Sequence, residues 1–197
     1  MKNLVLKTAL ITLGSIVDAL CILYGVFALF FPSNMANFLD NIGMQKASVS
    51  FYELQYEKTE DLLDLGTLCL KVDALDDNER AQKYLELLTS HEDFNDYLLA
   101  FDESNQNLIT GREFFYGKLA IATQKTSGVD EFLILANSLV EDGYTEFNCF
   151  YIALSTEGLF STEDLVKVKD ALNAIKPTLS DEEKVYLDRD LQYVENI

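Results

Sequence analysis

The longest apolar stretch of the chain lies near its start, where residues 8–31 contain one ionisable side chain, Asp18. At about 1.5 Å of rise per residue, a helix of this length spans roughly 36 Å. A bilayer has a hydrocarbon core of about 30 Å, so such a helix can cross it with some tilt. The pattern predicts a transmembrane helix over residues 8–31.

Asp18 does not cost enough to prevent insertion. A central Asp costs about 2.5–3.5 kcal/mol, whereas each Leu, Ile, Phe or Val favours insertion by about 0.3–0.6 kcal/mol. Thirteen such residues lie between Thr8 and Phe31, and together they contribute roughly 4–8 kcal/mol. A secretory signal peptide is the alternative, but its apolar region usually measures about 7–15 residues and ends at a small-residue cleavage site. The longer run here favours an uncleaved signal-anchor.

Small and polar residues recur on one face of this helix at spacings of 4, 3, 4 and 3: Gly14, Asp18, Cys21, Gly25 and Ala28. Small residues allow close approach of helices, and an intramembrane acid usually faces protein rather than lipid. We expect this face to contact another transmembrane helix, either in a second copy of the chain or in a partner. The alternative is an ordinary anchor that tolerates a protonated Asp18.

After Pro32, apolar positions recur at helical spacing and no strand-like alternation persists, which predicts an all-α domain. Four glycines fall between the expected helices: Gly111, Gly128, Gly143 and Gly158. Thr59 is expected to cap the helix that begins at residue 60. The helices are expected at residues 35–42, 46–58, 60–75, 78–89, around 94–101, 112–126, 129–141, 146–155, 162–175 and 182–194.

The flanking charges predict an orientation. Lys2 and Lys7 precede the apolar segment, and no Lys or Arg follows it before Lys46. By the positive-inside rule, the N-terminus is cytoplasmic and the large domain lies outside a single-pass cell-membrane anchor. The expected organisation is a cytoplasmic tail at 1–7, the transmembrane helix at 8–31, a connector at 32–45 and a soluble helical domain at 46–197.

The charge of the chain limits its partners. Without Lys2, Lys7 and Asp18, 13 basic and 32 acidic residues remain. Such a domain is repelled by nucleic acid and by anionic lipid headgroups. We therefore expect no nucleic-acid partner and favour a protein partner.

The helices follow one another in pairs. Three expected helices, which begin near Glu60, Arg112 and Glu146, are each followed by a second helix. The beginnings of the last two pairs are 34 residues apart. Residues 43–53 and 78–87 look like the second helix of such a pair, with Ala followed by an aromatic residue. In these features residues 46–197 resemble a divergent tetratricopeptide-like helical-hairpin repeat protein. The resemblance implies an α-solenoid that binds a protein or peptide, and an irregular helical bundle is the alternative.

Residues 101–114 resemble an EF-hand calcium loop. The candidate ligands, in order, are Asp102, Ser104, Gln106, the carbonyl of Leu108, Thr110 and Glu113. Among them, only Asp102 and Glu113 carry charge, so a calcium affinity at the weak, extracellular end of the range is expected at most. An ordinary polar loop between two helices is the favoured alternative, and no metal is predicted.

The sequence contains no motif of a catalytic or cofactor-binding site. The single histidine, His91, is expected to open a helix, and no Cys-x-x-Cys pair occurs. We expect no enzymatic activity and no cofactor. Cys69 and Cys149 fit buried free cysteines, and a disulfide between them is the alternative if the domain is external.

Overall fold

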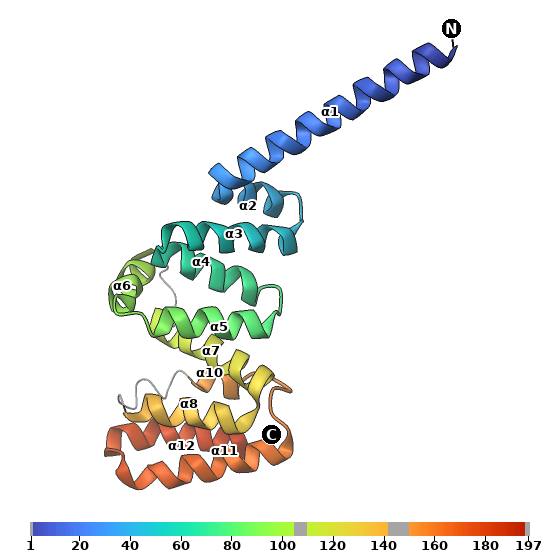
Figure 1. Ribbon diagram of the computed structural model, residues 1–197. Coiled ribbons are helices and arrows are strands. Elements are labelled where there is room, and N and C mark those ends of the chain that lie inside the picture. The colour runs from blue at the N-terminus through green and yellow to red at the C-terminus, as the bar shows by residue number, and fades with distance from the viewer. Residues whose placement is uncertain (1, 105–109, 142–149, 196–197) are drawn as a thin grey trace. The chain divides into compact units, whose positions relative to one another are not determined.

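The computed structural model describes residues 2–104, 110–141 and 150–195, and every regular element within these ranges is helical (Figure 1). The all-α prediction is confirmed. The chain divides into two compact units, residues 1–64 and residues 65–197. In chain order the elements are α1 (Lys2–Phe30), α2 (Pro32–Asn41), α3 (Gln45–Thr59), α4 (Leu62–Asp73), α5 (Asn78–Thr89), α6 (Phe94–Ser104), α7 (Gly111–Ser127), α8 (Val129–Glu141), α10 (Phe150–Leu154), α11 (Thr162–Ile175), the 3-10 turn η1 (Lys176–Thr178) and α12 (Asp181–Glu195).

The predicted bounds at 78–89, 129–141 and 162–175 agree with α5, α8 and α11 at both ends. The predicted cap at Thr59 is wrong, because Thr59 is the last residue of α3. Glu60 follows in the left-handed conformation, with a φ of 52°, and α4 begins at Leu62. The carboxylate of Asp61 accepts the N–H of Leu63 at 2.7 Å, so Asp61 holds the first turn of α4.

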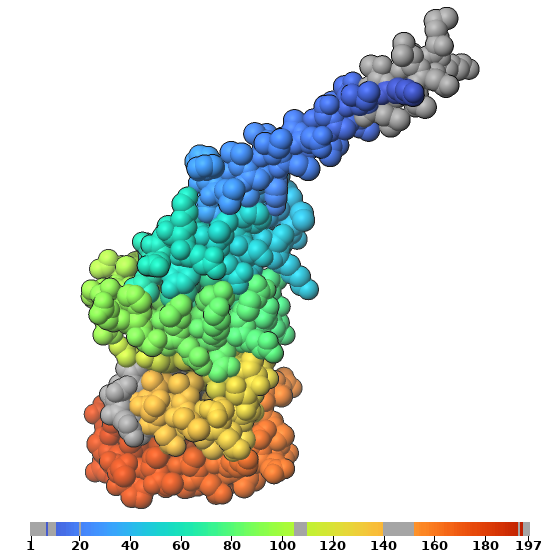
Figure 2. Space-filling view, in the orientation of Figure 1, coloured from blue at the N-terminus to red at the C-terminus, as the bar shows by residue number. Residues whose placement is uncertain are grey.

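α1 contains one segment, Ile11–Phe30, that is long and apolar enough to cross a membrane, and it is the one such segment in the described ranges. Its large apolar side chains are mostly exposed, among them Ile22 and Leu23. In the space-filling view, the coloured part of α1 extends beyond α2 and α3 (Figure 2). A signal sequence or a core helix of a soluble protein passes the same test of length and composition.

In the first unit, α2 and α3 form a hairpin with a small core. The face of α2 that carries Met35, Ala36 and Leu39 is buried, as are Val49 and Tyr52 of α3. Polar contacts also join α2 to α3. The Oη atom of Tyr52 lies 2.9 Å from Asn37 Oδ1 and 3.1 Å from Asp40 Oδ2, and the hydroxyl of Ser48 donates to the Asp40 carboxylate.

In the second unit, α7 is the central helix and packs against α5, α6, α8 and α10. Phe115 of α7 is fully buried and its ring contacts those of Phe94, Tyr97 and Phe101 from α6. Towards the C-terminal end, a second apolar cluster joins α8, α10, α11 and α12. Its most buried members include Phe132, Leu154, Val168 and Leu187.

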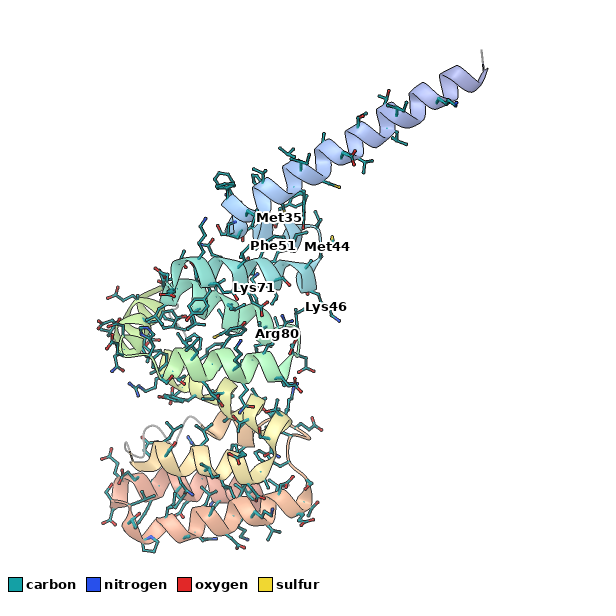
Figure 3. All side chains as sticks on the ribbon, viewed as in Figure 1. Met35, Met44, Lys46, Phe51, Lys71 and Arg80 are labelled. Carbon is teal, nitrogen blue, oxygen red and sulfur yellow. The ribbon has the colours of Figure 1, made fainter. Side chains whose placement is uncertain are left out.

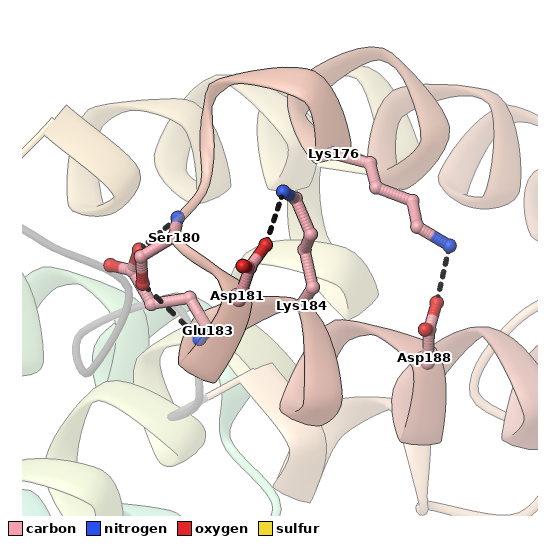
Figure 4. Close-up of polar contacts among 6 residues, drawn as sticks. All are labelled: Lys176, Ser180, Asp181, Glu183, Lys184 and Asp188. Atoms are coloured by element: carbon pink, nitrogen blue, oxygen red, sulfur yellow. Dashed lines mark hydrogen bonds and ion pairs between the residues drawn. The ribbon is translucent and has the colours of Figure 1, made fainter.

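Short polar motifs start the last helices. At α12 the N–H of Ser180 donates to Glu183 Oε2 at 2.7 Å, and the N–H of Glu183 donates to Ser180 Oγ at 3.3 Å (Figure 4). Ser161 and Asp164 make the same reciprocal pair at α11. Lys176 also reaches Asp188, at 2.5 Å, and so joins the end of α11 to the middle of α12.

Candidate functional site

The predicted contact face of α1 is open along most of its length. Apart from its chain neighbours and the backbone of α1 itself, no atom lies within 4 Å of where a Cβ atom would sit on Gly14. Asp18 and Cys21 are exposed, and Asp18 has no hydrogen-bond or ion-pair partner in the described part of the chain. Gly25 is half-buried and Ala28 is buried inside the first unit. The face available to another helix is therefore centred on Gly14, Asp18 and Cys21.

An apolar groove runs beside this face, between α1 and the start of α2. Figure 3 shows Met35 of α2 next to the end of α1. The lining side chains offer almost no polar surface that could orient a polar ligand, so the groove suits an acyl chain or an apolar side chain. It is lined by Val17, Cys21, Leu23, Tyr24, Phe27 and Met35.

The candidate calcium ligands have other partners in the structure. Asp102 and Ser104 belong to the last turn of α6, and Gln106 and Leu108 lie outside the described residues. The Oδ1 atom of Asp102 accepts the N–H of Gly111 at 2.6 Å. The hydroxyl of Ser104 donates to the carbonyl oxygen of Ala100 at 2.8 Å.

Thr110 and Glu113 form a capping box at the start of α7. The N–H of Glu113 donates to Thr110 Oγ1 at 3.2 Å, and the N–H of Thr110 donates to Glu113 Oε2 at 3.0 Å. In the described ranges, no group of three or more His, Cys, Asp or Glu side chains is arranged to hold a metal ion. Glu113 thus caps the start of α7, and Asp102 of α6 accepts the N–H of the first residue of α7 and so joins the two helices.

Burial governs the chemistry of Cys69. This cysteine is free and almost fully buried on α4, and burial raises the pKa of its thiol to about 12. The nearby carboxylate of Asp73, which pairs with Lys118 at 2.7 Å, acts in the same direction. The thiol therefore stays protonated at neutral pH and is a poor nucleophile and a poor metal ligand. Cys149 lies outside the described residues.

Sequence reasoning gave no role to Asp190, whose side chain is fully buried on α12. Arg189 donates to this carboxylate, and its Nε and Nη2 atoms lie 3.1 Å and 2.9 Å from Asp190 Oδ1. A signal was present, because Leu187, Asp190, Leu191 and Val194 are spaced by 3, 1 and 3 residues, which places the acid on the apolar face.

Two buried polar atoms on α7 were also missed. Thr123 Oγ1 and Gln124 Oε1 have no hydrogen-bond partner in the part of the chain that the structure describes. They directly follow Ala122, the last buried apolar residue of α7.

Comparison with known proteins assigns no function. No family model matches the chain, and neither a curated protein nor a solved structure matches it significantly. The functional argument therefore rests on the residues of this chain.

Proposed function

We propose that this protein is a membrane-anchored helical adaptor, held in a bilayer by α1 and binding a protein or peptide through its helical domain. The exposure of α1 carries the proposal. Ile22 and Leu23 are 68% and 65% exposed, although they lie on different sides of the helix. A helix that is apolar on all sides needs hydrocarbon or a protein core around it. The rest of the first unit leaves most of α1 uncovered, which favours lipid.

The contacts at the end of α1 support an anchor that stays attached to the protein. The rings of Tyr24 and Phe51 meet edge to face, with centroids 6.2 Å apart. The ammonium group of Lys58 lies 3.4 Å from the carbonyl oxygen of Phe30. Removal of α1 as a cleaved signal peptide would break both contacts.

The helical domain supports the adaptor role. Short turns join α4 to α5 and α7 to α8, and residues 46–197 carry the resemblance to tetratricopeptide-like repeats stated above. In such repeats, stacked hairpins offer an extended surface for a peptide or protein. The excess of acidic residues favours a basic partner, because charge complementarity speeds association and selects partners.

Membrane extraction tests the anchor. The full chain should remain with membranes after alkaline carbonate treatment, whereas a variant that lacks residues 1–31 should be released. Release of the full chain would contradict an integral anchor.

Labelling tests the orientation. Cys21, Cys69 and Cys149 are first replaced, and one cysteine is placed at Glu163, which is exposed on α11. An impermeant maleimide should label it in intact cells if the domain lies outside. Labelling that requires lysis would contradict this orientation.

Affinity capture tests the adaptor role. The full chain and the variant without residues 1–31 should retain the same stoichiometric protein partner, because the helical domain is present in both. The absence of any stoichiometric partner in both captures would contradict the role.

A second candidate function is that of an accessory subunit joined to a membrane complex through α1. Asp18 favours it, because an acid without a partner is costly in a bilayer and is expected to face another helix. In the same capture experiment, this function predicts that the partner is lost with residues 1–31. The third alternative, weak calcium binding at residues 102–113, is favoured by no contact among the described residues of this segment.

A further inference from the structure

An apolar stripe runs along the solvent side of α2. Phe38 belongs to α2, and Phe31 and Ile42 are the residues that directly precede and follow the helix. Their spacings of 7 and 4 residues correspond to one side at helical periodicity. Phe31, Phe38 and Ile42 are 51%, 56% and 53% exposed. The side of α2 that carries Met35, Ala36 and Leu39 is buried in the hairpin with α3, and Phe38 is an apolar side chain of α2 that this packing leaves exposed.

The hairpin is attached to the last turns of α1. Phe51 of α3 meets the ring of Tyr24, and Lys58 of α3 reaches the carbonyl of Phe30. Figure 3 shows Phe51 and Met35 close to the end of α1, and Met44 at the turn between α2 and α3. Tyr24 and Phe30 are separated by about 9 Å along the helix axis, at about 1.5 Å per residue.

This attachment sets the depth of the hairpin in a bilayer. The segment Ile11–Phe30 contains 20 residues. A helix of that length covers about 30 Å, which is the thickness of the hydrocarbon core. Contacts to its last 9 Å or so therefore bring the hairpin to the edge of the core, and interfacial helices bury their apolar face about 5–10 Å into this boundary.

We propose that α2 lies in the membrane interface, with Phe31, Phe38 and Ile42 in contact with lipid. The inference rests on the proposed anchoring by α1. The occupant is lipid because the stripe begins at Phe31, directly after the apolar surface of α1, and the two surfaces form one continuous apolar region. The chain then holds the membrane through two helices, and the second one restricts the angle at which the hairpin leaves the bilayer.

The charges next to α2 indicate which lipid surface it fits. Residues 32–64 contain two lysines and six acidic residues, so attraction to anionic headgroups is not the driving force. The exposed side chains that flank the stripe, Asn34 and Asn41, are neutral and can hydrogen-bond to headgroups. The surface that fits is zwitterionic phospholipid, and burial of the stripe drives the contact.

Depth measurement on the full chain tests the inference. The protein, with its three native cysteines replaced, carries one cysteine at Phe38 with an environment-sensitive fluorophore and is reconstituted into phosphatidylcholine vesicles. Lipids with a nitroxide near the headgroup or at mid-chain quench the fluorophore according to its depth. Reference sites are Leu23→Cys on α1 and Glu163→Cys on α11, both exposed in the structure.

The label at Phe38 should emit at shorter wavelength than the label at Glu163 and be quenched most by the shallow nitroxide. The label at Leu23 should be quenched most by the deep one. If the label at Phe38 instead gives the same emission and quenching as the label at Glu163, while the label at Leu23 is quenched most by the deep nitroxide, the interfacial position of α2 is refuted. That result leaves the membrane anchor supported. If Leu23 also behaves as Glu163 does, the anchor itself is refuted.

A second site guards against a local effect of the label. Ile42→Cys is expected to give the same shallow quenching as Phe38→Cys, and circular dichroism of each labelled protein checks that its helix content is unchanged. Shallow quenching at neither site in a protein of native helix content overturns the inference.

Discussion

Tyr97 of α6 lies across Gly66 of α4 so closely that a Cβ atom at Gly66 would be 2.1 Å from its Oη atom and 2.6 Å from its Cζ atom. The same ring packs on Phe94 and Phe115, with centroids 6.3 Å and 5.6 Å away. The absence of a side chain at Gly66 therefore allows one aromatic ring to join α4, α6 and α7.

We predict that Gly66→Ala destabilises the protein by about 1 kcal/mol. Alanine is favoured over glycine in a helix by about 1 kcal/mol. The added methyl group would overlap a ring packed on both sides, and overpacking of this kind costs about 1–3 kcal/mol. Urea unfolding followed by circular dichroism measures the change. In a Tyr97→Leu background, which removes the overlapping ring atoms, Gly66→Ala should be neutral or stabilising. An equal loss in both backgrounds would contradict the packing argument.

We predict that Thr110→Ala lowers the stability of the second unit by about 1 kcal/mol, because it removes the side-chain cap of α7. Ser161→Ala removes the matching cap of α11 and is the control of the same chemistry. Thermal unfolding with and without millimolar calcium should show no effect of the ion on either variant or on the native chain. A calcium-dependent rise of the midpoint that Glu113→Gln abolishes would instead establish cation binding at residues 102–113.

Burial of Cys69 predicts a loss of stability at alkaline pH. Its pKa is raised in the folded state from 9.0 to about 12, so above pH 9 the unfolded chain releases a proton that the folded chain keeps. The unfolded state then binds fewer protons, and the stability contributed by the neutral thiol falls as the pH rises from 9 towards 12. At about 1.4 kcal/mol per pH unit, the loss reaches roughly 2 kcal/mol at pH 10.5.

The measurement for Cys69 is the urea unfolding free energy at pH 8 and at pH 10.5, for the native chain and for Cys69→Ala. Alanine does not titrate, so the difference between the two proteins isolates the thiol from the other groups that titrate in this range. The native chain should lose more stability than Cys69→Ala. Equal losses would show that the thiol ionises as easily in the folded state as in the unfolded one.

We predict that Asp18→Leu weakens association of α1 with another membrane helix while easing insertion. Polar contacts between membrane helices contribute roughly 0.6–2 kcal/mol, so a decrease of about three- to thirtyfold in association is expected. A crosslinking assay in membranes measures it, and Leu23→Ala, on the side of α1 away from Asp18, should leave association unchanged. Equal association of Asp18→Leu and the native chain would make Asp18 a tolerated acid in an ordinary anchor.

The sequence by itself determined the helices, because their signals are local. The carboxylate of Asp77 caps α5 and Ser161 caps α11, and the apolar positions between such caps repeat at helical spacing. The predicted and observed bounds of α5 and α11 therefore agree. At Thr59 the prediction is wrong, because the carboxylate of Asp61 accepts the N–H of Leu63 and holds the first turn of α4. Which of two neighbouring residues caps a helix depends on the left-handed turn at Glu60, and the sequence pattern does not specify that turn.

Tertiary structure decided which faces of these helices are used. Ala28 and Gly14 belong to the same predicted face of α1, yet Ala28 is buried by its own chain and Gly14 is open. The spacing of α12 places Asp190 on its apolar face, and the packing of that face buries the acid completely. Glu113 occupies the position of a calcium ligand in the EF-hand resemblance, whereas in the structure it belongs to the capping box at the start of α7. Periodicity fixes which side of a helix a residue occupies, but what lies against that side depends on residues far away in the chain.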